Sequence, residues 1–236
     1  MFCASFAPSA EQVLLLRYGI RRTSELVSRL SHQRGTSFAI SPFMPHQHGV
    51  EEMTRQPHRP PHLYVAGATY FITGSTYHRR RLFKTDPQKS LLRDVLKDTV
   101  VQYDVRLYAW VILSNHYHLL FTVPSEERAV VRFVKAFHGA SAIELNKLDN
   151  TPGRQVWYQY RDRFPRNEAE FWSYFNYIHQ NPVKHGYMEK LGDIHQTLTQ
   201  YPFSSYGYYL RQYGEEFVAD VWERYLVIDH LEGDDF

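Results

Sequence analysis

Two histidines one residue apart, His116 and His118, lie in an apolar run of β-type residues, YAWVILSNHYHLLFTV from 108 to 123. Side chains alternate between the two faces of a strand, so both imidazoles project from one face and Tyr117 from the other. Neutral imidazole is a common metal ligand, and a strand holds a pair of ligands rigidly. The run therefore predicts either a metal site or a half-exposed strand with two hydrogen-bonded histidines.

The spacing alone does not decide between these interpretations. Chance would give about 0.7 such pairs in a chain of 236 residues with 13 His, and His46 and His48 form a second pair in a polar, Pro-flanked segment.

A tyrosine and an asparagine near residue 180 share a helical spacing. Tyr177 and Asn181 are four residues apart and lie on one face of the helix expected from Glu168 to Asn181. A phenol and a carboxamide oxygen can then face one point. The alternative is that Tyr174 and Tyr177 form an aromatic core stripe and Asn181 ends the helix.

Strands and helices must position these side chains. The pattern of β-branched, aromatic and periodic apolar residues predicts the order strand, helix, strand, strand, helix, strand, helix. A hairpin turning at Ser114 and Asn115, or one bent strand, would carry the histidines. Pro182 is expected to end the last helix, because proline disfavours helical geometry in the residue before it. This order implies a ferredoxin-like α+β fold, an antiparallel sheet with helices on one face. The remaining expected elements are strands 64–77, 105–113 and 156–164 and helices 86–100 and 130–148. Helix 86–100 is expected to start with Asp86 as the capping acid and Pro87 in the first turn.

Composition predicts a globular protein of one domain with appendages. Residues 1–60 read as an N-terminal extension with one helix from Ala10 to Leu30 capped by Ser9, residues 61–211 as the domain, and 212–236 as an acidic tail. A single cysteine, Cys3, excludes a disulfide framework and a Cys-based zinc site and indicates a reducing cytoplasm. No apolar run approaches the ~18 residues that span a membrane, so no membrane partner is expected.

Charge is distributed unevenly. Residues 1–211 hold 26 Lys and Arg against 17 Asp and Glu, whereas 212–236 hold eight acids and one base. A basic body indicates a polyanionic partner, and the acidic tail either shields that surface or keeps the chain soluble.

Five groups of residues, in order, carry a resemblance to a known family. They are Asn115-His116-Tyr117-His118 followed by Leu119-Leu120-Phe121, then Val156-Trp157, Tyr177-Ile178, Asn181-Pro182-Val183-Lys184-His185-Gly186, and Tyr201-Pro202-Phe203-Ser204-Ser205. Together they resemble the REP-associated tyrosine transposases, which belong to the single-tyrosine HUH transposases. The resemblance runs from about Tyr64 to Tyr209, and Ser114 departs from a proline common in the family.

The resemblance implies an endonuclease and strand transferase that acts on single-stranded DNA folded into a short palindromic hairpin. His116, His118 and Asn181 would bind a divalent cation, Mg²⁺ or Mn²⁺, and Tyr177 would attack the phosphate to form a 5′-phosphotyrosine. Such a cation neutralises charge on the phosphate without proton transfer. Imidazole ligands favour Mn²⁺ over Mg²⁺.

Basic side chains near this face are the expected DNA contacts, since single strands are held by phosphate contacts and by stacking on aromatic rings. Tyr158, Tyr160 and Trp157 are candidates for stacking, and Trp157 fits the core equally well. The expected phosphate contacts are Arg79, Arg80, Arg81, Lys84, Arg161, Arg163, Arg166, Lys184 and His185.

Two rival functions remain open on the sequence. One is a hairpin-DNA-binding regulator of the same fold that does not cleave, and the other is a metallohydrolase in which His116 and His118 activate water. The sequence is compatible with a monomer or a homodimer.

Overall fold

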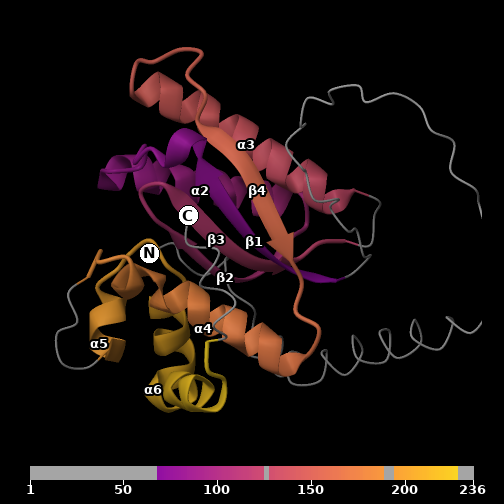
Figure 1. Ribbon diagram of the computed structural model, residues 1–236, viewed down its shortest axis with the longest axis vertical. Coiled ribbons are helices and arrows are strands. Elements are labelled where there is room, and N and C mark those ends of the chain that lie inside the picture. The colour runs from indigo at the N-terminus through magenta and orange to yellow at the C-terminus, as the bar shows by residue number, and fades with distance from the viewer. Residues whose placement is uncertain (1–67, 125–127, 189–193, 228–236) are drawn as a thin grey trace, which may run out of the picture.

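The protein is built on a four-stranded antiparallel sheet with the strand order β2-β3-β1-β4. The computed structural model describes residues 68–124, 128–188 and 194–227 (Figure 1). No helix in these ranges has the length and apolar character needed to cross a bilayer. The elements are β1 (Thr69–Thr76), the short 3-10 helix η1 (Tyr77–Arg79), α2 (Asp86–Gln102), β2 (Arg106–Ile112), β3 (His116–Thr122), α3 (Ala129–Leu148), β4 (Trp157–Arg163), α4 (Glu168–Lys184), α5 (Ile194–Thr199) and α6 (Tyr206–Arg224).

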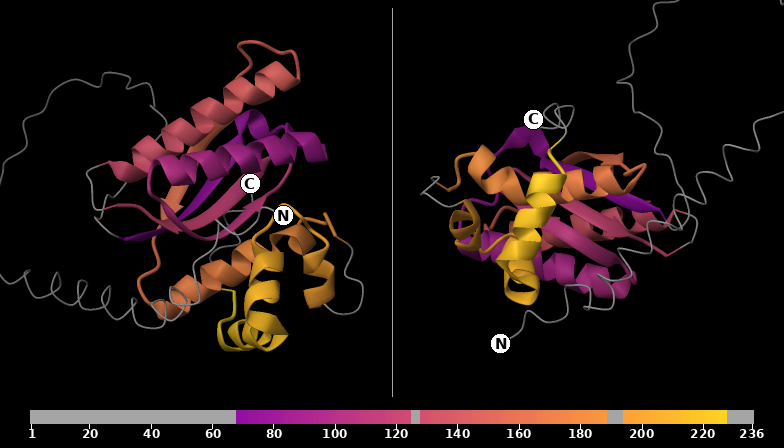
Figure 2. Two further views of the ribbon diagram at one scale, coloured as in Figure 1. Left: turned by 180° about the vertical axis from the view of Figure 1, so that it is seen from behind. Right: turned by 90° about the horizontal axis from the view of Figure 1, so that it is seen from below.

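Helices α2 and α3 pack together over the sheet (Figure 2), and the predicted ferredoxin-like α+β fold is confirmed. The alternation of β3 separates two environments. Tyr117 points to α3, where its ring meets Phe137 at 5.2 Å, whereas His118 points the other way and meets Tyr177 of α4 at 5.2 Å. Helix α4 therefore lies against the face opposite α3, alongside β2 and β3, and that face holds the histidine pair.

The histidine strand belongs to a hairpin. Ser114 and Asn115 form the turn between β2 and β3, and Leu113 N–H donates to His116 O at 2.9 Å to close it. Of the two predicted arrangements, the hairpin is the one present. The turn is also tied to the end of β1, because Thr76 N–H donates to Asn115 O at 2.9 Å.

Two predicted helix ends need correction. Thr85, not Asp86, caps α2: its hydroxyl accepts from Gln88 N–H, and the Gln88 side chain accepts from Thr85 N–H at 3.0 Å, so two terminal donors are satisfied together. Helix α4 does not end before Pro182 but continues to Lys184. Proline removes only one donor, and beyond it His185 N–H still donates to Asn181 O at 3.0 Å.

The segment after α5 covers the free edge of β2. Ser204 forms an antiparallel bridge with Val111, and Ile112 N–H donates to Phe203 O at 2.9 Å. The Tyr201 hydroxyl donates to Ile112 O at 2.7 Å. An uncovered edge strand would expose a row of unpaired backbone groups. The Tyr201–Ser205 motif therefore has a structural role in this protein.

The domain limits stay a prediction. Helix α6 runs through the expected boundary at residue 211 to Arg224, with a kink at Gly214, and its residues Val218 and Val221 are buried in the core. The expected helix Ala10–Leu30 with its cap Ser9, the rest of the 1–60 extension, the pair His46 and His48, and residues 228–236 of the tail lie outside the described residues.

Gly74 in β1 packs directly under the Tyr117 ring. A Cβ at this position would lie 2.4 Å from that ring, and the ring is fully buried, so it has no room to move. We expect Gly74→Ala to lower the free energy of unfolding by roughly 2–3 kcal/mol, measured by urea denaturation.

Gly139→Ala in α3 is the matched control, because nothing lies within 4 Å of its Cβ position. In a helix interior this change should raise stability by about 0.5–1 kcal/mol. Equal effects of the two substitutions would contradict the close packing of Gly74 and Tyr117.

Candidate active site

Both histidines of the pair are buried and their rings lie at an angle to each other. His116 is 5% exposed and His118 is fully buried, and their ring centroids are 5.0 Å apart with planes at 81°. The Nδ1 atom of His118 is 2.8 Å from Thr73 Oγ1, and that of His116 is 2.8 Å from Asn115 Oδ1. Because the Asn115 oxygen can only accept, His116 carries its proton on Nδ1 and its lone pair on Nε2.

His118 is held neutral by its surroundings. Burial lowers its pKa well below the usual value, the nearby His116 and His185 lower the pKa further, and the Asn181 side chain acts in the opposite direction. A neutral imidazole with one nitrogen hydrogen-bonded is the form in which histidine binds a metal.

Helix α4 brings Tyr177 and Asn181 to the same place. The Tyr177 ring centroid is 5.2 Å from that of His118, in the same chain, and the Tyr177 side chain is 1% exposed. Asn181 is fully buried, and its Nδ2 donates to Tyr177 O at 2.8 Å, one turn earlier. This bond uses the amide nitrogen and leaves Oδ1 directed away from it.

The donor atoms fit a divalent cation. His118 Nε2 and Asn181 Oδ1 are buried and have no hydrogen-bond partner, which is costly for polar atoms unless something else binds them. Within residues 68–124, 128–188 and 194–227, no three His, Cys, Asp or Glu side chains form a metal-binding cluster. The set expected from the sequence, two imidazoles and an amide, stays a prediction.

The comparisons with known proteins identify the family. The family model described as "Transposase IS200 like" matches residues 64–181, which is half of the chain. The chain belongs to the IS200-like transposase family. The resemblance drawn from the motifs is confirmed, as is the prediction of an enzyme, a transposase with a tyrosine nucleophile that acts on DNA.

Two relatives match this chain over stretches of similar length. A protein of Escherichia coli strain K12 named REP-associated tyrosine transposase is 25% identical over 148 residues, 61% of this chain and 79% of its own. A Haemophilus influenzae protein assigned to the same group is 26% identical over 152 residues, 61% of this chain and 82% of its own.

A solved structure shares the fold of this IS200-like transposase. It is described as the REP-associated tyrosine transposase bound to a REP hairpin. It matches with a TM-score of 0.53 and 20% identity over 66% of this chain and 86% of that one. The sheet and its covering helices are thus an arrangement that this chain shares with that structure.

Two of the expected DNA-contacting arginines lie on the histidine face of the transposase. Cross-strand partners share a face of a sheet, and Thr73 pairs both with His118 on β3 and with Arg161 on β4. Arg163 pairs with Phe71, whose ring stacks on His118 at 5.5 Å. Arg161 and Arg163 therefore project from the edge of the same surface as the imidazoles.

The other expected arginines, with Lys84, lie in two places. Arg79, Arg80, Arg81 and Lys84 are exposed in the segment after β1, and Thr76 Oγ1 donates to Arg80 O and Asn115 O, which places this segment beside the His116 end of β3. Arg166 is exposed before α4, where its guanidinium pairs with Glu170 at 2.5 Å.

Lys184 and His185 lie closer to the chemistry than the sequence indicated. Lys184 Nζ is 5.1 Å from the centre of the Tyr177 ring, and the His185 ring is 4.9 Å from that of His116. Both were expected to contact DNA, and both border the candidate site because α4 extends past Pro182. A positive charge beside a phenol favours its charged form, the phenolate.

The aromatic candidates for stacking also divide. Trp157 is a core residue: its ring stacks on His138 at 4.6 Å, and its Nε1 donates to Ser141 Oγ at 2.9 Å. Tyr158 is 56% exposed, and Tyr160 is half-buried on the same strand. Tyr158 is the better placed of these rings to meet a base.

Thr73 and Asn115 orient the imidazoles, and sequence reasoning missed both. Asn115 was detectable as the neighbour of His116, but Thr73 depends on the register of β1 and β3. A hydrogen bond to the second nitrogen of a metal-binding histidine typically changes metal affinity 10- to 100-fold.

We expect Thr73→Val to weaken Mn²⁺ binding by about 10-fold or more while the fold is kept, measured by isothermal titration. Thr69→Val is the matched control, because Thr69 on the same strand bonds Thr122 Oγ1 at 3.0 Å, away from the histidines. Equal Mn²⁺ affinity in both variants would exclude a role of Thr73 in orienting His118.

Proposed function

We infer that this transposase is a metal-dependent endonuclease and strand transferase for single-stranded DNA, with Tyr177 as nucleophile. The observation that carries the inference is the contact between His118 and Tyr177 within one chain, beside the buried Oδ1 of Asn181. His116, His118 and Asn181 would hold the cation, Mn²⁺ or Mg²⁺. Neutral ligands would leave its positive charge undiminished, and it would polarise the phosphate oxygens when bound.

The cleavage step follows from the residues present. The Tyr177 oxygen attacks the phosphorus and forms a 5′-phosphotyrosine, and the bond to the 3′ oxygen breaks to leave a 3′-hydroxyl. Lys184 stabilises the phenolate character that the attack requires, since an unperturbed tyrosine is mostly protonated at neutral pH. The new phosphodiester conserves the bond energy, so a 3′-hydroxyl can reverse the step and join strands.

The proposed substrate is hairpin DNA. A relative of the same fold is described as bound to a REP hairpin, and two relatives carry the REP-associated name. In this chain the arginines of β4 and the basic segment after β1 border the histidine face on two sides. They would bind phosphates on either side of the scissile bond.

The test is formation of a covalent adduct. The full chain would be incubated with hairpin oligonucleotides labelled at the 5′ or 3′ end, with Mn²⁺ or with EDTA, and analysed under denaturing conditions. An adduct that carries the 3′ label only and needs metal supports the proposal. Hairpin binding without any adduct would favour a non-cleaving regulator, and cleavage without an adduct a metallohydrolase.

The contact between Tyr177 and His118 in one chain supports an active site formed by a single subunit, whether the protein is a monomer or a homodimer. We further propose a cytoplasmic protein that associates with the nucleoid when it binds DNA. Mixing a Tyr177→Phe chain with a His118→Ala chain tests the first point, because activity restored by mixing would mean that the site is shared.

A further inference from the structure

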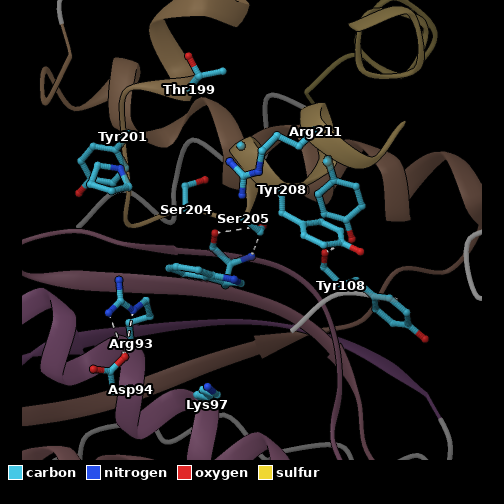
Figure 3. Close-up of a pocket in the computed structure, with 14 residues that line it drawn as sticks. Arg93, Asp94, Lys97, Tyr108, Thr199, Tyr201, Ser204, Ser205, Tyr208 and Arg211 are labelled. Atoms are coloured by element: carbon cyan, nitrogen blue, oxygen red, sulfur yellow. Dashed lines mark hydrogen bonds and ion pairs between the residues drawn. The ribbon is translucent and has the colours of Figure 1, made fainter. Parts of the chain in front are cut away.

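A pocket lies at the β2 edge of the sheet. It has a volume of about 410 Å³ and is formed by α2, β2, the Thr199–Ser205 segment and the start of α6 (Figure 3). This volume is in the range of pockets that bind small organic groups. Neither His116, His118, Tyr177 nor Asn181 lines it.

The pocket faces away from the candidate active site. Trp110 pairs with Leu119, which shares its face with Tyr117 and α3, whereas the next residue, Val111, pairs with His118. A ligand in the pocket would therefore contact the protein around the β2 edge, at a distance from the metal ligands.

Basic side chains approach the pocket from opposite walls. Arg93 and Lys97 come from α2, and Arg211 comes from α6 (Figure 3). Asp94 is the single acid of the lining, and it pairs with Arg93 at 3.0 Å. The lining thus has a net positive charge and favours an anion.

Gly207 makes room for the guanidinium of Arg211. Arg211 Nη1 lies 3.2 Å from the position that a Cβ of residue 207 would take, so the guanidinium rests over the glycine. Both residues line the pocket.

The rest of the lining is aromatic and hydroxylic. Tyr108, Trp110 and Tyr208 are among the rings around the pocket, and Ser204 adds a hydroxyl. The wall is fixed: Trp110 N–H donates to Ser205 Oγ at 3.0 Å, and Ser205 N–H donates to Trp110 O at 3.0 Å. Aromatic rings beside cationic groups are the combination that binds a base and its phosphate in single-stranded DNA.

We propose that this pocket binds one unpaired nucleotide of the DNA strand outside the active site, with its base against Trp110 and Tyr208 and its phosphate between Arg211 and Lys97. The proposal rests on the proposed function, in that the substrate is single-stranded DNA. Ser205 Oγ is also 2.7 Å from His179 Nε2, on the helix that carries Tyr177 and Asn181, so the pocket wall is directly attached to the helix of the active site.

Binding of fluorescein-labelled dT12 to the full chain tests the proposal, measured by anisotropy in EDTA. The double variant Lys97→Gln/Arg211→Gln should weaken binding about 10-fold, and the dependence of log Kd on log salt should fall by about 1.4, or 0.7 for each lost contact. Arg224→Gln is the matched control on the same helix. Arg224 pairs with Asp220 and does not line the pocket, so its affinity should stay within about twofold of the unmodified protein.

Crosslinking shows where the strand lies. Photolysis of a dT12 containing 5-iodouracil should attach it to the peptides of Trp110 or Tyr208, identified by mass spectrometry. Affinity of the double variant within twofold of the unmodified protein, or crosslinks found only on other peptides, would overturn the proposal. Binding of dTMP and of inorganic phosphate is measured by competition. If these bind through Arg211 while dT12 does not, the ligand of the pocket is a free nucleotide or an ion and the proposal is overturned.

Failure of this proposal is distinct from failure of the proposed function. The binding measurements need no metal and no cleavage. Crosslinks in the pocket without any covalent adduct would contradict only the proposed cleavage activity. Adducts that form equally well after Lys97→Gln/Arg211→Gln, together with no crosslinks in the pocket, would contradict only the proposed nucleotide site.

Discussion

Tyr177→Phe is expected to abolish the covalent adduct with hairpin DNA and to lower cleavage roughly 10³-fold or more, since removal of a nucleophile eliminates the covalent route. The phenyl ring keeps the packing against His118 and Phe71, whose centroids lie 5.2 and 5.9 Å from that of Tyr177. Hairpin affinity should therefore remain within about twofold. Denaturing gels measure the adduct, and anisotropy measures the binding.

Tyr174→Phe is the matched control. Tyr174 lies one turn earlier on α4, is buried and stacks on Phe71 at 4.5 Å, so the substitution removes one hydroxyl from a similar environment. Adduct formation should survive it. An adduct that persists in Tyr177→Phe and maps to another tyrosine would assign the nucleophile elsewhere, and cleavage unchanged by the substitution would favour water as the attacking group.

The features predicted best were those that depend on local pattern. Alternation in 108–123 placed His116 and His118 on one face of a strand, and the four-residue spacing placed Tyr177 and Asn181 on one face of a helix, as the structure has them. Both are properties of a short segment, fixed by the periods of the strand and the helix.

The features that were missed depend on contacts between distant segments. Thr73 meets His118 only through the register of β1 and β3. Pro182 is tolerated inside α4, where residues 170–179 are all buried, because tertiary packing outweighs the local preference. Trp157 was undecided because a strand residue can face either way, and its stacking on His138 of α3 fixed it in the core.

The C-terminal part of the chain also depends on contacts that the local sequence pattern does not reveal. The acidic tail expected from residue 212 stays a prediction as a domain limit, and the burial of Val218 and Val221 in α6 depends on contacts with distant segments that the acidic composition does not reveal. In the sequence the Tyr201–Ser205 motif was only part of the family resemblance. The structure gives it a physical role, because it contacts β2 through Tyr201 and α4 through Ser205. These contacts also form one wall of the pocket that we propose for DNA.

His118→Ala should abolish both Mn²⁺ binding and metal-dependent cleavage. A ligand that binds only the folded state raises the melting temperature, by the equivalent of about 2.7 kcal/mol at a concentration 100 times its Kd. We expect the unmodified protein to show this rise with Mn²⁺ and His118→Ala to show none, measured by differential scanning calorimetry. His116→Ala should behave alike, because it removes the other imidazole of the pair.

A structural role of the buried imidazole must be separated from metal binding, since deleting it leaves a cavity beside Phe71 and Tyr177 and lowers stability even without metal. His138→Ala provides the comparison. This histidine is on α3, on the other side of the sheet, and its Nε2 is 2.7 Å from the Tyr117 hydroxyl. His138→Ala should destabilise the protein yet keep the full rise with Mn²⁺. If His118→Ala also kept that rise, the histidine pair would be a core feature, and the metal would have to bind elsewhere.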